Sequence, residues 1–500
     1  MDKMERMDAG QIKETEEIAR WMQAHEEEFL QDLADFVAIP SVSVKQEGEG
    51  AEEAPYGQGC ADCLNFFLKL GEKYGFETEN LWGQFGRLRW KGTTGKKRIG
   101  IFAHGDVVPV DENWERNPFL LWRKGNWLVG RGVDDNKGPA LSVFYALRYL
   151  KEKGFLLQNT VEMYLGSAEE TGMWDIKELL KRNYSFPDFS LIPDAGFPVC
   201  YGEKGILRVL ASVELKESGL LEFTGGEADN IVAAKAKAVL AEGMAADLAE
   251  KQKDCRIDAL AEKQKDSGIK ILREKGKVTV FSAGLGKHSA FPEGSRNAIG
   301  QLARFLTENG FVTGKTGEIF AFLGRVTEGF YGEELGIAYE DEPFGKLTHV
   351  LTRVWYENGT LKTEYNIRYP YQVNQEEMLG NIEKTLRQAG FTEISMENDA
   401  PFLREKGRKA EFLTALSNEI LGAEDAPYVM SGGTYARRVP GAVAYGFGNC
   451  HIAEPVPFPA GHGGAHQPDE AVHPDKLRKG MMIYVLALRK LDEEMKGNGE

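Results

Sequence analysis

Apolar side chains recur along this chain at two spacings. Some segments repeat them every three to four residues, as a helix with one buried face does, and others alternate them or group them in short runs, as strands do. Helices and strands alternate through the first 200 residues, which favours an α/β layer architecture. The expected helices there are 12–37, 60–75, 137–153 and 174–182, and the expected strands are 98–103, 159–165 and 189–192.

The pattern changes after about residue 206. A long alternating stretch predicts strand, and a stretch rich in Ala, Lys and Glu predicts helix. We interpret this block as a separate α+β domain, with strands at 206–223, 278–281 and 361–369 and helices at 229–266, 295–308 and 375–389.

One sequence repeat lies within the expected long helix of this block. The heptapeptide Leu-Ala-Glu-Lys-Gln-Lys-Asp occurs at 248–254 and again at 260–266. A period of twelve residues does not match a solenoid unit. We therefore interpret the repeat as a local duplication in an exposed helical hairpin, without a function.

Bulk composition excludes several classes of partner. Five hundred residues suggest two or more domains. A net charge of -16 and a pI near 5.2 argue against nucleic acid and anionic membranes as partners. The charged first 28 residues lack the apolar core of a signal peptide, and no window is apolar enough for a membrane helix, so we expect a cytoplasmic protein.

The cysteines indicate no metal site. Cys60 and Cys63 form a C-x-x-C pair, but no second pair follows at zinc-site spacing. We interpret the two thiols as half-buried helix side chains in a reducing compartment.

Polar side chains follow the expected strands of the first part. His104, the Glu169–Glu170 pair and Asp194 each come just after a strand, where sites gather in open α/β sheets. Asp134 and Asp135 lie in a Gly-rich segment, and His466 comes much later. Each residue alone is more often structural, but imidazoles and carboxylates without thiolates are together the ligand set of a two-metal hydrolase.

The ligand chemistry allows a division of roles. Two cations about 3.5–4 Å apart need a bridging carboxylate, and we assign it to Asp134. His104 and Asp194 would complete one metal site, and Glu170 and His466 the other. Asp106 would accept the second ring N–H of His104. Glu169 would take a proton from the metal-bound water and deliver it to the leaving nitrogen.

These segments resemble the di-zinc metallopeptidase family that includes aminoacylase, carboxypeptidase G, succinyl-diaminopimelate desuccinylase, tripeptidases and carnosinases. The resemblance implies a three-layer α/β zinc-peptidase catalytic domain with an inserted α+β lid domain. It also implies a cis peptide bond next to the bridging Asp, which we place between Asp134 and Asp135. The matching segments are 104–109, Trp114 with 117–119, 130–139, 166–172 and 193–195.

Four histidines compete for the last ligand position: His451, His462, His466 and His473. In the family motif a metal-binding His is followed four residues later by Glu, which favours His466 with Glu470. His462 departs from the family pattern. Because His466 lies after a helix at 409–421 and just before the last helix, 475–494, we expect the middle block to be an insertion. The predicted parts are catalytic 1–206, lid 207–392 and catalytic 393–500.

Within the family the chain most resembles the bacterial dipeptidase V group, the Xaa-His or β-Ala-Xaa dipeptidases. The segments 192–198, 366–370 and 432–437 and the long middle domain carry this likeness. It implies a lid that covers the zinc site within one chain, hence a monomer, with a dimer left open. His288 would stabilise the oxyanion, although Phe291 before Pro292 departs from the usual lid segment. Asn230 would be a second lid donor.

The resemblance also limits the class of substrate. Arg368, with Gly433 and Thr434, would hold a substrate carboxylate, so we predict a zinc dipeptidase acting on unblocked dipeptides. One alternative is an N-acyl-amino-acid deacylase or carboxypeptidase of the same family, and another is a non-catalytic peptide-binding protein. Two Zn²⁺ per chain are expected, with Mn²⁺ or Co²⁺ as substitutes.

Overall fold

The chain divides into two compact units in a computed structural model. Unit 1 contains Met1–Gly202, Arg404–Tyr428 and Gly433–Glu500, and unit 2 contains Glu203–Leu403 and Val429–Gly432. The predicted lid segment, 207–392, therefore falls inside unit 2. The structure describes residues 9–48, 50–215, 219–241, 268–274, 276–450 and 452–496, so the heptapeptide repeat and His451 lie outside the described residues.

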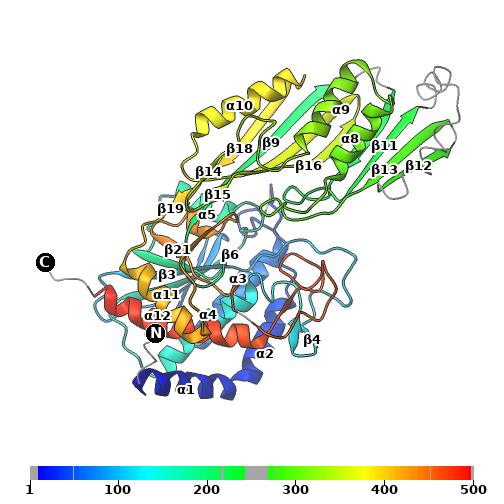
Figure 1. The fold of residues 1–500 in the computed structure, drawn as a ribbon. Helices are drawn as coiled ribbons and strands as arrows, with labels where there is room; N and C mark the ends of the chain where they lie inside the picture. Colours follow the sequence, from blue (N-terminus) through cyan, green and yellow to red (C-terminus); the bar gives the residue numbers. More distant parts are fainter. Residues whose placement is uncertain are drawn as a thin grey trace, which may run out of the picture. The chain divides into compact units, whose positions relative to one another are not determined.

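Unit 1 is built on a twisted sheet with a parallel centre (Figure 1). Strands β6, β3, β7 and β21 are successive parallel neighbours. Their side chains are almost all buried, which is why these segments read as short apolar runs. An antiparallel hairpin, β1–β2, extends the sheet beyond β6. The bounds are β1 Glu77–Leu81, β2 Phe85–Trp90, β3 Arg98–His104, β6 Thr160–Gly166, β7 Phe189–Ile192 and β21 Ala442–Ala444.

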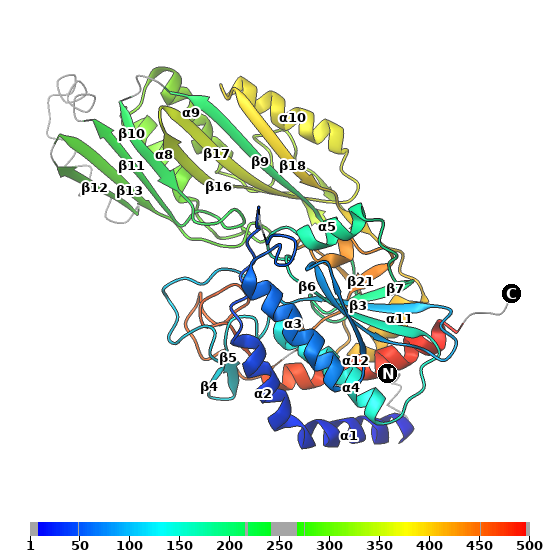
Figure 2. The ribbon, with the colours of Figure 1, turned by 180° about the vertical axis from the view of Figure 1, so that it is seen from behind.

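Helices pack on this sheet and on one another (Figure 2). Helix α3 contacts β1, β2 and β6, and α4 contacts β3. Helix α4 is buried from its first residue through Leu150, because α2 and α12 pack against it in turn. The helices of unit 1 are α1 Ala9–Ala24, α2 Glu26–Val37, α3 Gln58–Lys73, α4 Lys137–Glu152, α5 Trp174–Lys181, α11 Arg408–Leu421, α12 Pro474–Glu494 and the short 3₁₀ helix η1 Tyr435–Arg437.

The predicted helix 12–37 is two helices. The chain leaves helical geometry at His25, with φ -112° and ψ 12°. The His25 ring stacks on Trp21 at a centroid distance of 4.0 Å, and its Nδ1 lies 2.7 Å from the Trp21 carbonyl oxygen. The apolar spacing continues across this break, so the pattern did not reveal it. The second helix ends shortly before Pro40, as predicted.

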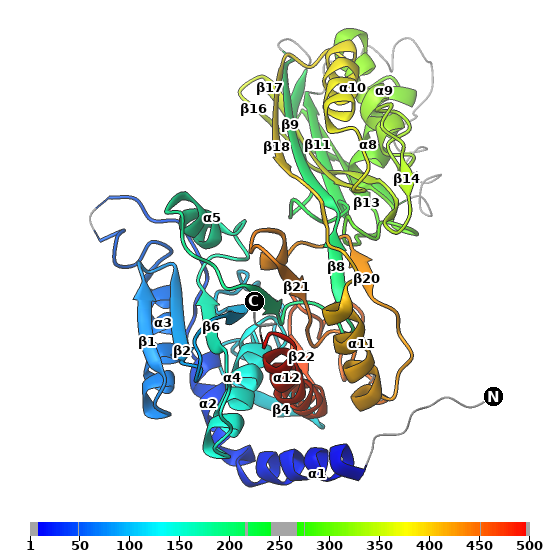
Figure 3. The same cartoon turned by 90° about the vertical axis from the view of Figure 1, so that its left-hand side faces the viewer.

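Unit 2 is an eight-stranded antiparallel sheet in the order β12-β13-β11-β10-β16-β17-β9-β18. Helices α8, α9 and α10 lie on one face of it (Figure 3) and bury its apolar side chains in one core. The bounds are β9 Gly205–Glu214, β10 Leu220–Gly225, β11 Lys235–Ala241, β12 Ile269–Glu274, β13 Lys277–Ala283, α8 Ala298–Glu308, α9 Gly314–Val326, β16 Thr348–Glu357, β17 Thr360–Tyr369, α10 Gln375–Gln388 and β18 Glu393–Asp399.

The predicted helix 229–266 is wrong at its start. Residues Lys235–Ala241 form β11, which pairs with β10 and β13. Their Ala and Lys content favours a helix, but Lys and Ala alternate over the first four positions, and pairing on both sides decides the outcome. Similarly, the single strand expected at 206–223 is two strands, β9 and β10.

Several short elements complete the structure. A three-stranded sheet joins β22 to β5 and β4, which brings the segment after residue 470 beside residues 128–129. None of the helices among the described residues is long and apolar enough to cross a membrane. The remaining bounds are β4 Trp122–Lys124, β5 Trp127–Val129, β8 Cys200–Glu203, β14 Glu340–Asp341, β15 Gly345–Lys346, β19 Phe402–Leu403, β20 Tyr428–Met430 and β22 Ala471–Val472.

A buried histidine in unit 2 makes stability depend on pH. His349 is 2% exposed and stacks on Tyr365, and its Nε2 has no hydrogen-bond partner among the described residues. Burial lowers its pKa from 6.5 to about 4. Between those values the unfolded chain binds a proton that the folded protein does not. The free energy of unfolding should therefore fall by up to about 3 kcal/mol as pH drops from 6.5 to 4.

Urea unfolding at pH 7 and pH 5 checks this expectation. His349→Phe keeps an aromatic ring against Tyr365 and removes the titrating group. The variant should lose less stability than the wild type between the two pH values. Equal losses in both proteins would contradict the assignment to His349.

Candidate metal centre

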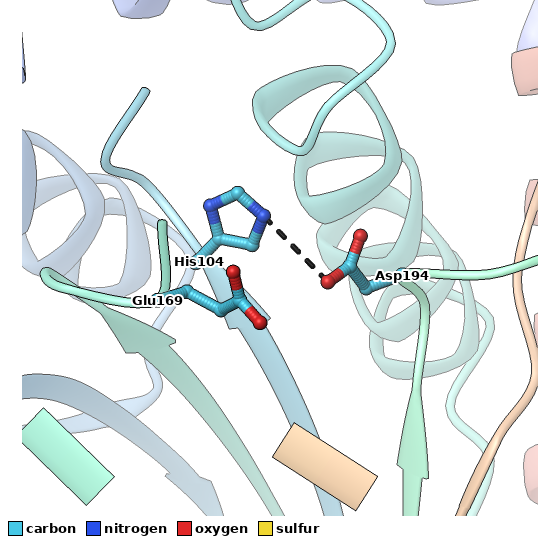
Figure 4. Close-up of side chains that lie close together, drawn as sticks. All are labelled: His104, Glu169 and Asp194. Atoms are coloured by element: carbon cyan, nitrogen blue, oxygen red, sulfur yellow. Dashed lines mark ion pairs between the residues drawn. The ribbon is translucent and has the colours of Figure 1, made fainter. Parts of the chain in front are cut away.

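Three elements of unit 1 bring the first polar side chains together. His104 is the last residue of β3, Glu169 follows the end of β6, and Asp194 follows β7. Because these strands are parallel neighbours, their carboxyl ends meet at one edge of the sheet. The three side chains converge there (Figure 4), with His104 Nε2 at 3.7 Å from Asp194 Oδ2. The predicted grouping of these strand ends agrees with this geometry.

A second group lies beside the first and shares His104. Asp135 places Oδ1 at 3.0 Å from His104 Nε2 and Oδ2 at 3.0 Å from His466 Nε2. His466 Nε2 is also 3.1 Å from the carboxylate of Glu170. Within the described part of the chain, the sets His104–Glu169–Asp194 and His104–Asp135–Glu170 have ligand atoms close enough to hold a metal ion.

Asp135, not Asp134, has the position of a bridging carboxylate. The Asp134 side chain points elsewhere and forms a largely buried ion pair with Lys476 of α12. Consecutive side chains point in different directions, so only one of the two can face both histidines. The cis peptide bond is also one residue later than expected, between Asp135 and Asn136. No signal in the local sequence distinguishes the two aspartates.

Asp106 lies beside His104, and its carboxylate also has a task that was not predicted from the sequence. His104 Nδ1 is 3.0 Å from the main-chain oxygen of Asp106, and the carboxylate is farther away, at 3.6 Å. The carboxylate also accepts hydrogen bonds from the backbone N–H groups of Glu169 and Glu170, at 3.0 and 3.1 Å, and from the Ser43 hydroxyl. Asp106 thus fixes the turn that carries both glutamates.

The carboxylates that gather at this edge of the sheet fit a pair of divalent cations. Burial, followed by the nearby charge of Asp194, raises the pKa of Glu169 well above its usual range. Burial and then Asp135 raise the pKa of Glu170 to about 7, and the same two causes raise that of Asp194. Glu169 Oε1 is buried without a hydrogen-bond partner among the described residues. Buried negative charge of this kind needs compensating cations, and imidazole with carboxylate is a zinc ligand set.

Comparison with known proteins identifies the family. Residues 100–490 match the model of peptidase family M20/M25/M40. The chain belongs to this family. The resemblance predicted from the motifs is therefore confirmed, and so is the α/β fold class, with a catalytic domain and a lid.

Relatives cover nearly the whole chain. It is 30% identical over 494 residues to a Beta-Ala-Xaa dipeptidase of Lactobacillus delbrueckii subsp. lactis, covering 95% of this chain and 98% of that protein. It is 29% identical over 479 residues to the putative dipeptidase YtjP of Bacillus subtilis (strain 168), covering 93% and 97%. The fold resembles that of human carnosine dipeptidase 1, with a TM-score of 0.57, 14% identity and coverage of 96% and 99%.

The other candidate histidines of this M20 family chain have separate partners. His462 Nδ1 is 2.8 Å from Asp469 Oδ2, within its own loop. His473 is the N-cap of α12 and accepts the backbone N–H of Asp475. Of the described candidates, His466 is therefore the one that lies against Asp135 and Glu170.

In unit 2, two residues that were not predicted as site residues link the predicted lid residues to one another. Ser289 follows His288, and its backbone N–H donates to the Asn230 carbonyl oxygen at 2.8 Å. The Ser289 hydroxyl donates to Asn366 Oδ1 at 3.0 Å, and Arg368 Nε donates to the same oxygen at 2.9 Å. Asn366 thus links the His288 loop to Arg368. It stands two residues before Arg368 on β17, where alternation puts both on one face.

The Gly433–Thr434 segment begins the last part of unit 1. The Thr434 hydroxyl accepts the Ala436 N–H at 3.1 Å and caps η1. A contact of this segment with a substrate carboxylate stays a prediction.

Cys60 and Cys63 are more deeply buried than the half-buried thiols expected. The Cys63 thiol donates to the Gly105 carbonyl oxygen at 3.2 Å, directly behind the His104 segment. Burial raises the pKa of both thiols, which keeps them protonated and unreactive.

Proposed function

We propose that this chain is a di-zinc dipeptidase that hydrolyses the peptide bond of unblocked dipeptides. The observation that carries the proposal is the Asp135 carboxylate, with one oxygen at 3.0 Å from His104 and the other at 3.0 Å from His466. That arrangement is the one expected of a carboxylate shared by two cations. The dipeptidase relatives support the substrate class.

The proposed ligands divide evenly between the two zinc ions. His104 and Asp194 would hold one, Glu170 and His466 the other, and Asp135 both. Bound zinc would supply a Lewis acid for the peptide carbonyl and lower the pKa of a water molecule. Mn²⁺ or Co²⁺ are substitutes, since carboxylate-rich sites accept several divalent ions.

Glu169 is the proposed general base. It is buried beside the ligands, and its Oε1 has no other hydrogen-bond partner among the described residues. Glu169 takes a proton from the attacking water and later delivers it to the leaving amine nitrogen. Asp106 holds this glutamate in place through the Glu169 N–H.

The lid residues complete the proposal. His288 donates a hydrogen bond to the oxyanion of the tetrahedral intermediate, and Asn230 is a second donor. Arg368 binds the substrate carboxylate together with Gly433 and Thr434. We also propose that the protein is a monomer and that it is cytoplasmic. Sedimentation of the purified chain at several concentrations would test whether it is a monomer.

A substrate panel with metal analysis tests this function. We expect hydrolysis of free dipeptides, little turnover of N-acetyl or N-succinyl amino acids, and two zinc ions per chain. Chelation should abolish the activity and lower Tm, because buried carboxylates then lose their compensating charge. Turnover of the acylated substrates alone would instead support a deacylase. Two bound zinc ions without any hydrolysis would support a peptide-binding protein.

Arg368→Lys tests the substrate carboxylate. We expect KM for a dipeptide to rise about 10- to 100-fold with kcat little changed, because lysine cannot form the bidentate pair. Arg353→Lys is a matched control, since Arg353 belongs to the same sheet and pairs with Glu364. A dipeptide amide should be hydrolysed equally by wild type and Arg368→Lys. An unchanged KM for the free dipeptide would remove Arg368 from the site.

A further inference from the structure

A fully buried carboxylate that has no part in the mechanism above lies four residues after His466. Glu470 is 0% exposed. We infer that Glu470 is a positioning residue, whose carboxylate clamps the backbone of 132–135 and thereby holds the Asp135 side chain between the two histidines. The inference rests on the proposed function, because it assigns Glu470 to the same metal site.

The Glu470 carboxylate gathers the N–H groups of one short segment. Its Oε1 accepts the backbone N–H groups of Asp134 and Asp135, at 2.9 and 3.0 Å. Its Oε2 accepts the Gly132 N–H at 3.1 Å and Arg131 Nη1 at 2.8 Å. Backbone N–H groups that bond to an ionised oxygen form stronger hydrogen bonds than neutral pairs do. The segment that ends at Asp135 is therefore held at several successive points.

Glu470 itself is fixed from the other side. Its carbonyl oxygen accepts the Gly130 N–H at 3.0 Å, and the next residue, Ala471, pairs with Val129 in the three-stranded sheet. Arg131 is 2% exposed, and its guanidinium lies 4.9 Å from the centroid of the Trp114 ring. The ion pair with Arg131 compensates the buried charge of Glu470.

The Asp135 side chain can move little without losing its contacts. Both of its oxygens lie at 3.0 Å from a histidine nitrogen, one from β3 and one from the loop of His466. A displacement of its backbone would lengthen at least one of these distances. Side chains that orient a metal ligand typically contribute about 10- to 100-fold to metal affinity.

Glu470 and Asp106 have equivalent roles at the site. Asp106 follows one histidine and holds the backbone of Glu169 and Glu170, while Glu470 follows the other histidine and holds that of Asp134 and Asp135. Each histidine segment thus fixes carboxylate ligands that come from a different segment. This symmetry of roles supports a task for Glu470 at the site rather than in the loop alone.

Glu470→Gln is the test, with metal affinity as its main readout. The amide fills the same space but turns one acceptor oxygen into a donor that faces N–H groups. We expect zinc affinity, measured by competition with a chromophoric chelator, to fall about 10- to 100-fold. Saturating zinc should restore part of kcat. Glu470→Asp keeps the charge on a shorter side chain, so its zinc affinity should lie between those of the wild type and Glu470→Gln.

Asp492→Asn is the matched control. Asp492 is also buried and also accepts backbone N–H groups, those of Gln158 and Asn159, but it belongs to α12 and contacts no proposed ligand. It should lower Tm and leave zinc affinity within about twofold.

Zinc affinity at the wild-type level in Glu470→Gln overturns the inference, and an equal loss in Asp492→Asn overturns it as well. If Glu470→Gln does not fold, an unchanged affinity in Glu470→Asp overturns it. A wild-type chain that binds no divalent cation overturns the proposed function together with this inference, whereas the first three results leave the proposed function standing.

Discussion

Replacing Glu169 with alanine is expected to lower kcat by about 10²–10⁴-fold while both zinc ions stay bound. Glu169 lies beside the ligands, yet Asp135 and Glu170 contact the histidines more closely than it does. Its loss therefore removes the proposed proton acceptor and leaves the carboxylate of Asp135, the proposed bridge. Metal content by elemental analysis and steady-state kinetics on one dipeptide would measure both effects.

Glu162→Gln is the matched control for Glu169. Glu162 is fully buried on β6, the strand that precedes Glu169, and it pairs with arginines of the sheet. This substitution should change Tm but not kcat. Near wild-type turnover in Glu169→Ala would exclude Glu169 as the base, and loss of zinc from that variant would make it a ligand instead.

Replacing Asp135 and Asp134 separately should give opposite results. Asp135→Ala removes the carboxylate that faces both histidines, so affinity for both zinc ions should fall by more than the roughly 10- to 100-fold of a lost outer partner. Asp134→Ala leaves the largely buried Lys476 ammonium without its partner. It should cost about 3–5 kcal/mol of unfolding free energy and leave zinc affinity nearly unchanged.

The double variant Asp134→Leu with Lys476→Met separates charge from packing. Apolar side chains in place of a buried ion pair are often neutral or stabilising, so this variant should regain most of the stability lost in Asp134→Ala. Zinc titration and urea unfolding of the three proteins would check the pattern. Loss of zinc from Asp134→Ala, with retention in Asp135→Ala, would restore the assignment made from sequence.

The sequence predicted which candidate residues gather at the ends of the parallel strands. His104, Glu169 and Asp194 follow short apolar runs, and parallel strands bring their ends together. It did not distinguish Asp134 from Asp135, because the difference lies in the pairing of Asp134 with Lys476, more than 300 residues away in the chain. Contacts at such separations leave no periodic pattern in either segment.

The fold could be predicted from the sequence to about the same extent as the candidate site. Apolar runs located the parallel strands of unit 1, where both faces are covered. In unit 2, Lys235–Ala241 carries helix-forming residues in a strand, because neighbours on both sides supply its hydrogen bonds. Asn366 was visible in a motif, but its link to Ser289 appears only once β17 and the His288 loop are folded.

The order of the proposed site residues along the chain also determines when the site can first form. Asp194 and His466 are separated by the whole of unit 2, and Glu470 follows His466. A ribosome adding about 5–20 residues per second needs on the order of tens of seconds to pass from one to the other. Until then the nascent chain has neither the proposed ligand His466 nor the carboxylate that we infer to hold Asp135. The growing polypeptide therefore lacks the proposed centre until residue 470 has been added.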